Sequence, residues 1–200
     1  MIVAEIEQKD GPGITVRRIV TPNDVSQWRA GFIGAYQTVF SGFPYFERWY
    51  PSEAEGVYRR LTSLEGNVTL VATRDTTQVV GFGVGIPITG NRAVATVLTG
   101  LIPLKHTFYL AELGVLDSWR GRGVGRTLVR ERLRLIDPQL YSHVVLRVSM
   151  NHSPSTEMYK AMGFEEMGVY MDVNAMRTDG KSTTDRRMFL SKVLSQVALD

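Results

Sequence analysis

The feature that most constrains this chain is a glycine-rich turn at residues 119–126, Trp-Arg-Gly-Arg-Gly-Val-Gly-Arg. An apolar segment precedes it at 108–115, and a segment with apolar residues at helical spacing follows it at 123–136. The turn is therefore predicted to join a buried strand to a helix. Glycine lets the backbone approach a ligand closely, and the first N–H groups of a helix have no partner within it. This arrangement indicates a phosphate-binding cradle, which the helix dipole reinforces.

Two common phosphate-binding loops do not match these residues. A P-loop ends in Gly-Lys-Ser/Thr, whereas Gly125 is followed by Arg126 and Thr127. A Rossmann fingerprint needs a third glycine where Arg126 stands, and it belongs to the first strand–helix–strand unit of its domain. The arginines in and beside the turn favour a pyrophosphate ligand. A turn that only packs a helix against a sheet is the alternative.

The remaining segments predict one α/β domain, in the order β-α-α-β-β-β-α-β-α-β-β. We expect a mixed, mostly antiparallel sheet flanked by helices, with its parallel part in the strand–helix–strand unit at 108–148. Periodicity and turn residues mark the elements. Strands are expected at 14–20, 68–73, 79–86, 108–115, 144–148, 164–170 and 186–190, and helices at 25–39 (with a start signal at 21–24), 52–64, 123–136 and 154–162.

Composition narrows the class of protein. The 200 residues suit a single domain spanning 1–200, and the absence of cysteine excludes disulfides and thiolate metal sites. A net charge of +3 is too mild to indicate a nucleic-acid partner, and the three histidines lack metal-ligand spacing, so no metal is expected. The N-terminus does not resemble a signal peptide, and the apolar stretch 93–104 is shorter than the roughly 20 residues that span a bilayer. We expect a cytoplasmic protein without a membrane partner.

Two motifs carry a resemblance to a known family. The pattern R-x-x-G-x-G, formed by Arg120, Gly123 and Gly125, resembles the acyl-CoA pyrophosphate loop of the GNAT superfamily of N-acetyltransferases. Downstream, residues 159–164 (YKAMGF) are similar to that family's Y-x-x-x-G-F element. The resemblance covers 108–164, which we take as the cofactor-binding core. It implies a GNAT-like acyl-CoA N-acyltransferase fold and acetyl-CoA as the cosubstrate.

The resemblance also implies roles for individual residues. The end of the strand at 113–115 would offer backbone groups to the pantetheine arm, and backbone N–H groups at 120–126 would hold the pyrophosphate. The family often has Asn seven residues before the tyrosine; His152 stands there, and Asn151 is one residue earlier. The predicted cofactor-binding residues are Leu113, Gly114, Val115, Arg120, Gly121, Arg122, Gly123, Val124, Gly125, Arg126, Asn151 and Ser155.

Glu112 is the predicted general base. An alkyl amine with a pKa near 10.4 is almost wholly protonated at pH 7, so its attack on a thioester needs a proton acceptor. Glu112 is the one ionisable carboxyl in FYLAELGV, and the family often has an acidic base at this place. A structural ion pair with an arginine is the alternative, and Tyr109 acting through water is the second candidate. Strict alternation would put Glu112 on the face of Phe108 and Leu110, unless a β-bulge intervenes.

Tyr159 is the predicted general acid. Its phenol is protonated at pH 7 and can donate to the departing thiolate. The resemblance implies a position near the thioester sulfur, whereas a core tyrosine on a helix is the alternative. A backbone N–H near Val115 is expected to polarise the thioester carbonyl.

The acceptor site is expected outside the cofactor-binding core. The aromatic stretch 43–50 could form its wall, with Tyr45, Glu47 and Tyr109 as candidate substrate-binding residues, or it could be a loop that only covers the core. The segment 87–107 is long and apolar for a connection, which indicates a lid, an acceptor pocket or a dimer contact.

The sequence thus predicts an acetyl-CoA-dependent N-acetyltransferase. It would act on a primary amine, of a small molecule in the first instance, by direct transfer in a ternary complex. A peptide or protein amine as acceptor, and a non-catalytic acyl-CoA-binding sensor, are the alternatives. A homodimer is the expected partner arrangement, as the family resemblance implies.

Overall fold

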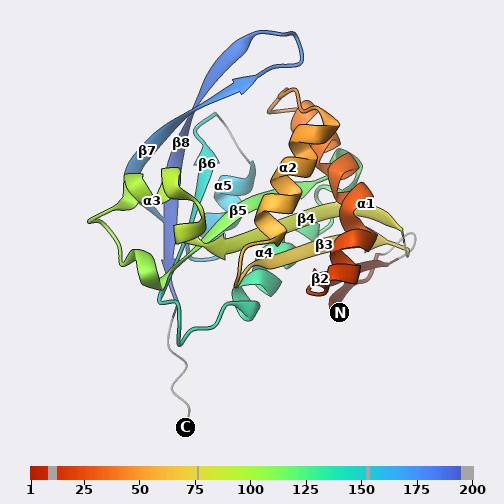
Figure 1. The fold of residues 1–200 in the computed structure, drawn as a ribbon, viewed down its shortest axis with the longest axis horizontal. Helices are drawn as coiled ribbons and strands as arrows, with labels where there is room; N and C mark the ends of the chain where they lie inside the picture. Colours follow the sequence, from red (N-terminus) through yellow and green to blue (C-terminus); the bar gives the residue numbers. More distant parts are fainter. Residues whose placement is uncertain (9–12, 76, 152–153, 195–200) are drawn as a thin grey trace.

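A computed structural model of the chain describes residues 1–8, 13–75, 77–151 and 154–194 (Figure 1). Thr76, between the strands predicted at 68–73 and 79–86, and His152 lie outside the described residues. The elements are β1 (Ile2–Ile6), β2 (Ile14–Ile19), α1 (Pro22–Ser41), α2 (Pro51–Thr62), β3 (Val68–Arg74), β4 (Gln78–Pro87), α3 (Arg92–Leu98), β5 (Thr107–Val115), α4 (Val124–Leu135), β6 (His143–Ser149), α5 (Pro154–Ala161), β7 (Glu165–Met176) and β8 (Ser182–Val193), with short 3-10 turns η1 (Ile88–Gly90), η2 (Leu104–His106) and η3 (Asp117–Trp119).

The described strands form one eight-stranded sheet in the order β1-β2-β3-β4-β5-β6-β8-β7. Every pair is antiparallel except β5 and β6, which are the two ends of the predicted parallel unit. The mixed, mostly antiparallel sheet flanked by helices is therefore confirmed. The parallel pairing is brief, since it ends at Tyr109 opposite Val145.

Helices cover both faces of the sheet. Residues of α1, α2 and α3 share one core with one face, and α4 and α5 pack on the opposite face (Figure 1). Helix α1 begins as its sequence predicts: the Thr21 hydroxyl accepts from the Asp24 N–H, and the Asp24 carboxylate accepts from the Thr21 N–H. None of the helices in the described residues is long and apolar enough to span a bilayer.

An aromatic cluster joins α1 to the middle of the sheet. Phe82 on β4 is fully buried, and its ring centroid lies 4.7 Å from that of Phe32 and 5.6 Å from that of Tyr36. Gly114 on β5 leaves room for it, since a Cβ at Gly114 would stand 2.3 Å from the Phe82 ring. The cluster therefore fixes α1 over the part of β5 that the sequence assigns to the cofactor.

The structure differs from the sequence prediction at three places. Strand β1 was not predicted, because IVAEI is short and half-exposed and gains its stability from pairing with β2. Strands β7 and β8 extend well beyond the predicted ranges into polar sequence, and their hairpin projects from the sheet (Figure 1). Helix α3 is rich in β-branched residues, which obscures its helical character, but Asn91 caps it through the Val94 N–H.

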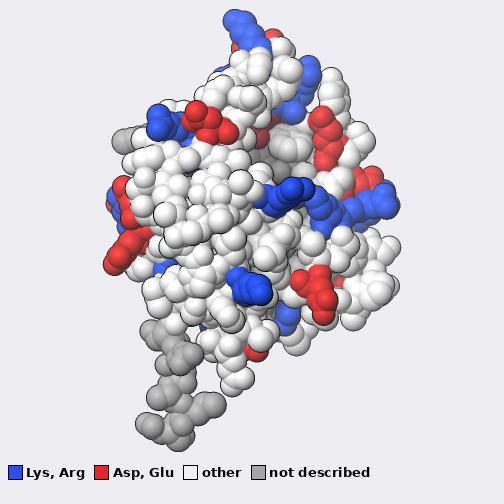
Figure 2. All heavy atoms as spheres, turned by 60° about the vertical axis from the view of Figure 1, so that its left-hand side comes forward, with Lys and Arg blue, Asp and Glu red and all other residues white. Residues whose placement is uncertain are grey.

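The segment 87–107 contributes to the main core. Val94 and Leu98, four residues apart on α3, are both fully buried. Leu101 is 58% exposed. Figure 2 turns this side of the molecule forward and shows a broad area without charged side chains. The three roles left open for this segment, a lid, an acceptor pocket or a dimer contact, stay predictions.

Replacing Phe82 with Ala should lower the free energy of unfolding by about 3 to 5 kcal/mol, because a large buried ring is removed from a packed cluster. Denaturant titration followed by circular dichroism measures the change. Leu140→Ala, at a side chain that is 58% exposed, is the control and should change it by about 0.5 kcal/mol or less. A loss at Phe82 as small as the control's would contradict the role given to this cluster.

Candidate active site

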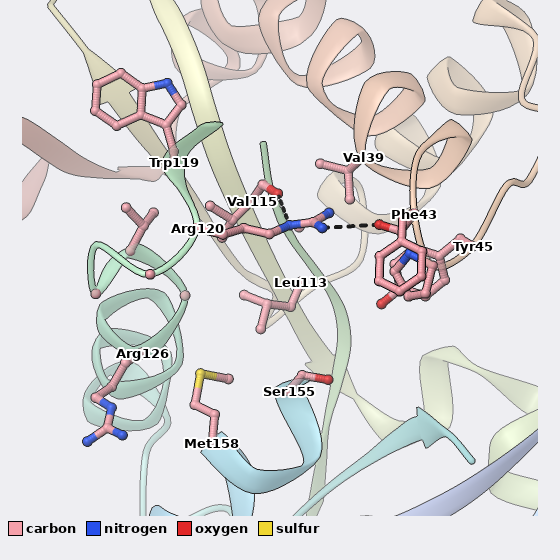
Figure 3. Close-up of a pocket in the computed structure, with 16 residues that line it drawn as sticks. Val39, Phe43, Tyr45, Leu113, Val115, Trp119, Arg120, Arg126, Ser155 and Met158 are labelled. Carbon is pink, nitrogen blue, oxygen red and sulfur yellow. Dashed lines mark hydrogen bonds between the residues drawn. The ribbon is translucent and has the colours of Figure 1, made fainter. Parts of the chain in front are cut away.

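A cavity of about 470 Å³ opens where β5 and β6 separate. Both strands continue past their last paired residues without hydrogen-bonding to each other, so backbone groups at the end of β5 face a gap rather than a neighbouring strand. The cavity lies between this strand end, the glycine-rich turn and the start of α5 (Figure 3). Its lining residues are Val39, Phe43, Pro44, Tyr45, Leu113, Gly114, Val115, Trp119, Arg120, Gly121, Gly123, Val124, Gly125, Arg126, Ser155 and Met158.

The glycine-rich turn is built as an anion cradle. Gly121 and Gly123 have φ of 73° and 82°, in the left-handed region that glycine adopts most readily. Gly123 is the N-cap of α4 and supplies no side-chain cap, so the N–H groups of the first helical turn are left for a ligand. A Cβ at either glycine would meet no atom within 4 Å, so the space above the turn is open. These features suit a pyrophosphate.

The arginines of the turn have different tasks. Arg120 crosses the cavity mouth: its Nε donates to the Val115 carbonyl at 3.2 Å, and its Nη1 donates to the Phe43 carbonyl at 3.1 Å (Figure 3). Its side chain therefore ties the turn to the segment after α1. Arg126 is exposed, and in Figure 3 it extends away from the cavity centre, where it can meet a phosphate at the rim.

Ten of the twelve predicted cofactor-binding residues line this cavity. The other two are Arg122, whose guanidinium lies 5.1 Å from the Trp119 ring centroid, and Asn151, whose Nδ2 donates to Asp185 Oδ1. Tyr45, predicted for the substrate, lies in this cavity as well. Sequence reasoning did not name Met158, although it lies three residues after Ser155 on α5 and therefore on the same side of that helix.

A β-bulge in β5 decides the orientation of Glu112. Glu112 pairs with Val84, but Leu110 pairs with Gly85, so Ala111 is one extra residue on β5. The bulge reverses the alternation, and Glu112 lies on the face of Val84 and Tyr109 rather than that of Leu110. The side of the sheet that strict alternation predicts for Glu112 is therefore wrong, because the bulge adds one residue to the strand.

Glu112 faces a second cavity of about 310 Å³. Burial raises the pKa of Glu112 to about 7, against the lowering effect of Arg187 and Arg147. A carboxyl with this pKa is poised to accept and release a proton near neutral pH. The cavity is lined by Tyr36, Phe40, Glu47, Arg48, Trp49, Glu53, Val57, Arg60, Glu112, Arg147, Val173, Asn174, Ala175, Met176 and Arg187.

Four arginines line the cavity: Arg48 and Arg60 are exposed, Arg187 is paired with carboxylates, and Arg147 is half-buried without a carboxylate partner among the described residues. Arg187 binds Glu47 Oε1 at 3.2 Å and Asp185 Oδ2 at 3.0 Å, and Glu47 also accepts from Trp49 Nε1. Arg147 is half-buried and forms no ion pair with a described residue; its Nη1 donates to Met171 Sδ at 3.2 Å. Glu47 thus lines this cavity, and its predicted role in substrate binding stays a prediction.

Tyr109 and Tyr159 are both buried and line neither cavity. Tyr159 packs edge-on against Phe164 at 5.5 Å, and burial raises its pKa while the nearby Arg132 charge lowers it. Burial likewise raises the pKa of Tyr109, and Arg147 lowers it. Glu112 forms no ion pair among the described residues, so the structural ion pair that the sequence left open is not present there.

Arg132 is a polar residue at the site that sequence reasoning missed. It is fully buried under the bulge, and its Nη1 donates to the carbonyls of Val84 and Glu112. The sequence spacing of Arg132 does indicate its burial, since Arg132 follows the buried Leu128 by four residues and therefore lies on the same side of α4.

Comparisons with known proteins agree with this geometry. The profile of the acetyltransferase (GNAT) family matches residues 34–164. N-acetyltransferase 8B of Rattus norvegicus is 32% identical over 96 residues, which are 45% of this chain and 42% of that protein. This chain therefore spans about two fifths of the length of that curated relative.

Solved structures share the fold. Ribosomal-protein-alanine N-acetyltransferase from Brucella melitensis superposes with a TM-score of 0.64 at 20% identity, over 90% of this chain and 99% of that one. Arabidopsis thaliana NAA60, solved in complex with acetyl-CoA, gives a TM-score of 0.62 at 15% identity, over 90% of this chain and 98% of that one. The chain belongs to the GNAT acetyltransferase family, and its GNAT fold is the one that the sequence predicted.

The titration of Glu112 can be measured without a substrate. We expect its carboxyl ¹³C resonance, assigned by its loss in Glu112→Gln, to titrate at about 7. Replacing Arg147 with Met should move the titration to higher pH, because it removes a cation that favours the carboxylate. Arg92→Met on the exposed end of α3 is the control and should leave it unchanged. A wild-type titration near the ordinary glutamate value of about 4.3 would contradict the desolvated environment.

Proposed function

We propose that this chain transfers the acetyl group of acetyl-CoA to a primary amine of a small molecule that also carries a carboxylate. The first cavity supports acetyl-CoA as donor, because the uncapped start of α4 and the two left-handed glycines suit its pyrophosphate. The acetyl-CoA complex of the structural relative from Arabidopsis thaliana supports the same donor.

The observation that carries a small acceptor is the closed side of the second cavity. The segment after α1 is hydrogen-bonded to the β7–β8 hairpin: the Arg48 N–H donates to the Met176 carbonyl at 2.7 Å, and the Thr178 N–H donates to the Phe46 carbonyl at 2.9 Å. These backbone bonds join the two segments beside the cavity, and we infer that they leave no room for an extended peptide on that side. A volume of about 310 Å³ also lies within the range of small-molecule sites, roughly 300 to 1,000 Å³.

The charges of the cavity indicate a zwitterionic acceptor. Arg187 already has two carboxylate partners, so an incoming anion has less to gain there. Arg147 is half-buried without one, and a carboxylate on the acceptor would supply the charge-assisted hydrogen bonds that it lacks. The acceptor's amine would then lie toward Glu112, whose pKa Arg147 influences directly.

The chain's own residues supply the proton transfers. Acetyl-CoA provides an activated acetyl thioester when bound. Glu112, ionised above about pH 7, accepts a proton from the amine, directly or through water. A backbone N–H at the open end of β5, near Val115, would stabilise negative charge on the carbonyl oxygen. Tyr159 remains our candidate for returning a proton to the thiolate.

Acceptor class is tested with matched amines. We expect free thiol release from acetyl-CoA with phenylalanine, and at least about tenfold lower kcat/KM with phenylalaninamide, phenethylamine and a dipeptide, because these lack a carboxylate beside the amine. Arg147→Met should remove most of this preference, whereas Arg92→Met should keep it. Polyamines, aminoglycosides and other amino acids complete the panel.

The other outcomes identify the alternatives. Equal turnover of the amino acid and its amide would contradict the proposal that the acceptor carries a carboxylate, but it would still support a small amine as acceptor. Preference for peptides would favour the peptide N-acetyltransferase. Coenzyme A binding with no turnover of any amine would favour the sensor module.

The pH dependence of kcat tests the base. Because Glu112 accepts a proton only when ionised, kcat should rise as pH increases through about 7. Glu112→Gln should remove this limb and lower kcat by about 10²- to 10⁴-fold. The assay uses a saturating concentration of amine, so that ionisation of the unbound amine does not affect the pH profile of kcat. Glu53→Gln, a carboxylate on the same cavity wall, should keep the limb; a normal profile in Glu112→Gln would instead assign the base elsewhere, with Tyr109 next.

A further inference from the structure

Arg132 is a buried cation in an otherwise apolar part of the molecule. Its side chain is 0% exposed, and it projects from α4 toward the face of the sheet opposite to Glu112's carboxyl. No carboxylate of the described residues pairs with it, whereas its neighbours Arg130 and Arg134 both bind Glu131. A buried unpaired arginine is costly, so its retention needs a compensating contact or a function.

Its hydrogen bonds meet at the bulge of β5. Nη1 donates to the Glu112 carbonyl at 2.9 Å and to the Val84 carbonyl at 3.1 Å, and Nε donates to the Leu128 carbonyl at 3.2 Å. Val84 and Glu112 face each other at the edge of the bulge, where the extra residue Ala111 interrupts the ladder. One guanidinium nitrogen therefore joins both strands at the point that turns Glu112 toward the acceptor cavity.

Gly83 makes room for this arrangement. A Cβ at Gly83 would stand 2.8 Å from Arg132 Nε and 3.0 Å from its Cζ. A glycine inside a strand commonly marks such a close approach. The site thus has two parts that depend on each other, the arginine on α4 and the glycine on β4.

The same cation lies beside Tyr159. Its Nη2 has no hydrogen-bond partner among the described residues. That charge lowers the pKa of Tyr159 against the raising effect of burial. A cation there stabilises the phenolate that remains after Tyr159 gives up a proton.

We propose that Arg132 is a positioning residue for proton transfer: it holds the bulge of β5 that orients the Glu112 side chain toward the second cavity. It touches no substrate, because it lines neither cavity. The inference rests on the proposed function for its kinetic consequences, but not for its effect on the Glu112 carboxyl.

The test uses the full chain with Arg132→Met, Arg132→Lys and Gly83→Ala. Gly83→Ala displaces the guanidinium without removing its charge, and Lys keeps the charge but cannot form the same fork of bonds. The controls are Arg134→Met, at an exposed arginine of the same helix, and Gly34→Ala, where a Cβ would meet nothing within 4 Å. Each variant is scored for coenzyme A binding, for the ¹³C titration of Glu112, and for kcat per coenzyme A-binding site.

We expect Arg132→Met and Gly83→Ala to bind coenzyme A as wild type does and to lower kcat by about 10²-fold or more. Glu112 should titrate about one pH unit or more away from its wild-type value, because its environment changes with the bulge. Arg132→Lys should be intermediate. In a Glu112→Gln, Tyr159→Phe background, Arg132→Met should cost about twofold or less, since its effect acts through those groups.

Two results would overturn the inference. The first is an unchanged Glu112 titration in folded Arg132→Met or Gly83→Ala, which needs no acceptor and so stands apart from any failure of the proposed function. The second is a loss of kcat as large in the double-variant background as in wild type. If Arg132→Met does not fold, Gly83→Ala and Arg132→Lys decide by the same measures.

Discussion

The site depends on the irregular course of one strand. β5 pairs with β6 over only three residues and then separates from it, and in the same stretch Ala111 bulges out of the ladder with β4. The separation frees backbone groups at 113–115 for a ligand, and the bulge turns Glu112 to the other face. A regular β5 would have continued pairing with β6 and left no cavity. It would also have put the Glu112 carboxyl beside Leu110, in the apolar core under α4.

Consecutive residues consequently serve different cavities. Leu113 lines the cavity with the glycine-rich turn, and Glu112 lines the one with the arginines. The segment after α1 is divided in the same way, with 43–45 in the first cavity and 47–49 in the second. One strand and one loop thus contribute residues to both cavities, which places the two cavities next to each other. Arg120 adds to this link by binding the Phe43 carbonyl from the turn.

The sequence predicted what depends on local pattern and missed what depends on packing. The turn at 119–126, its helix and the strand before it follow from glycine spacing and periodicity, and ten of the predicted cofactor contacts line one cavity. The bulge leaves no mark in FYLAELGV, because alternation alone cannot reveal an extra residue in a ladder. The sequence did not distinguish Arg132 from the exposed arginines of the same helix. Its burial depends on two strand carbonyls that only the folded sheet brings within reach of the guanidinium. The polar extension of β7 and β8 is held by strand pairing rather than by an apolar pattern.

The charges around Glu112 resolve a difficulty that its pKa creates. A carboxylate with a pKa of about 7 is a weak base for an alkyl amine such as a lysine side chain, whose pKa is near 10.4, and this proton transfer is unfavourable by roughly three pKa units. The arginines of the acceptor cavity reduce this gap, because nearby cations lower the pKa of a bound ammonium. The same arginines also lower the pKa of Glu112, which makes it a weaker base. Burial has the larger effect and keeps the pKa of Glu112 raised.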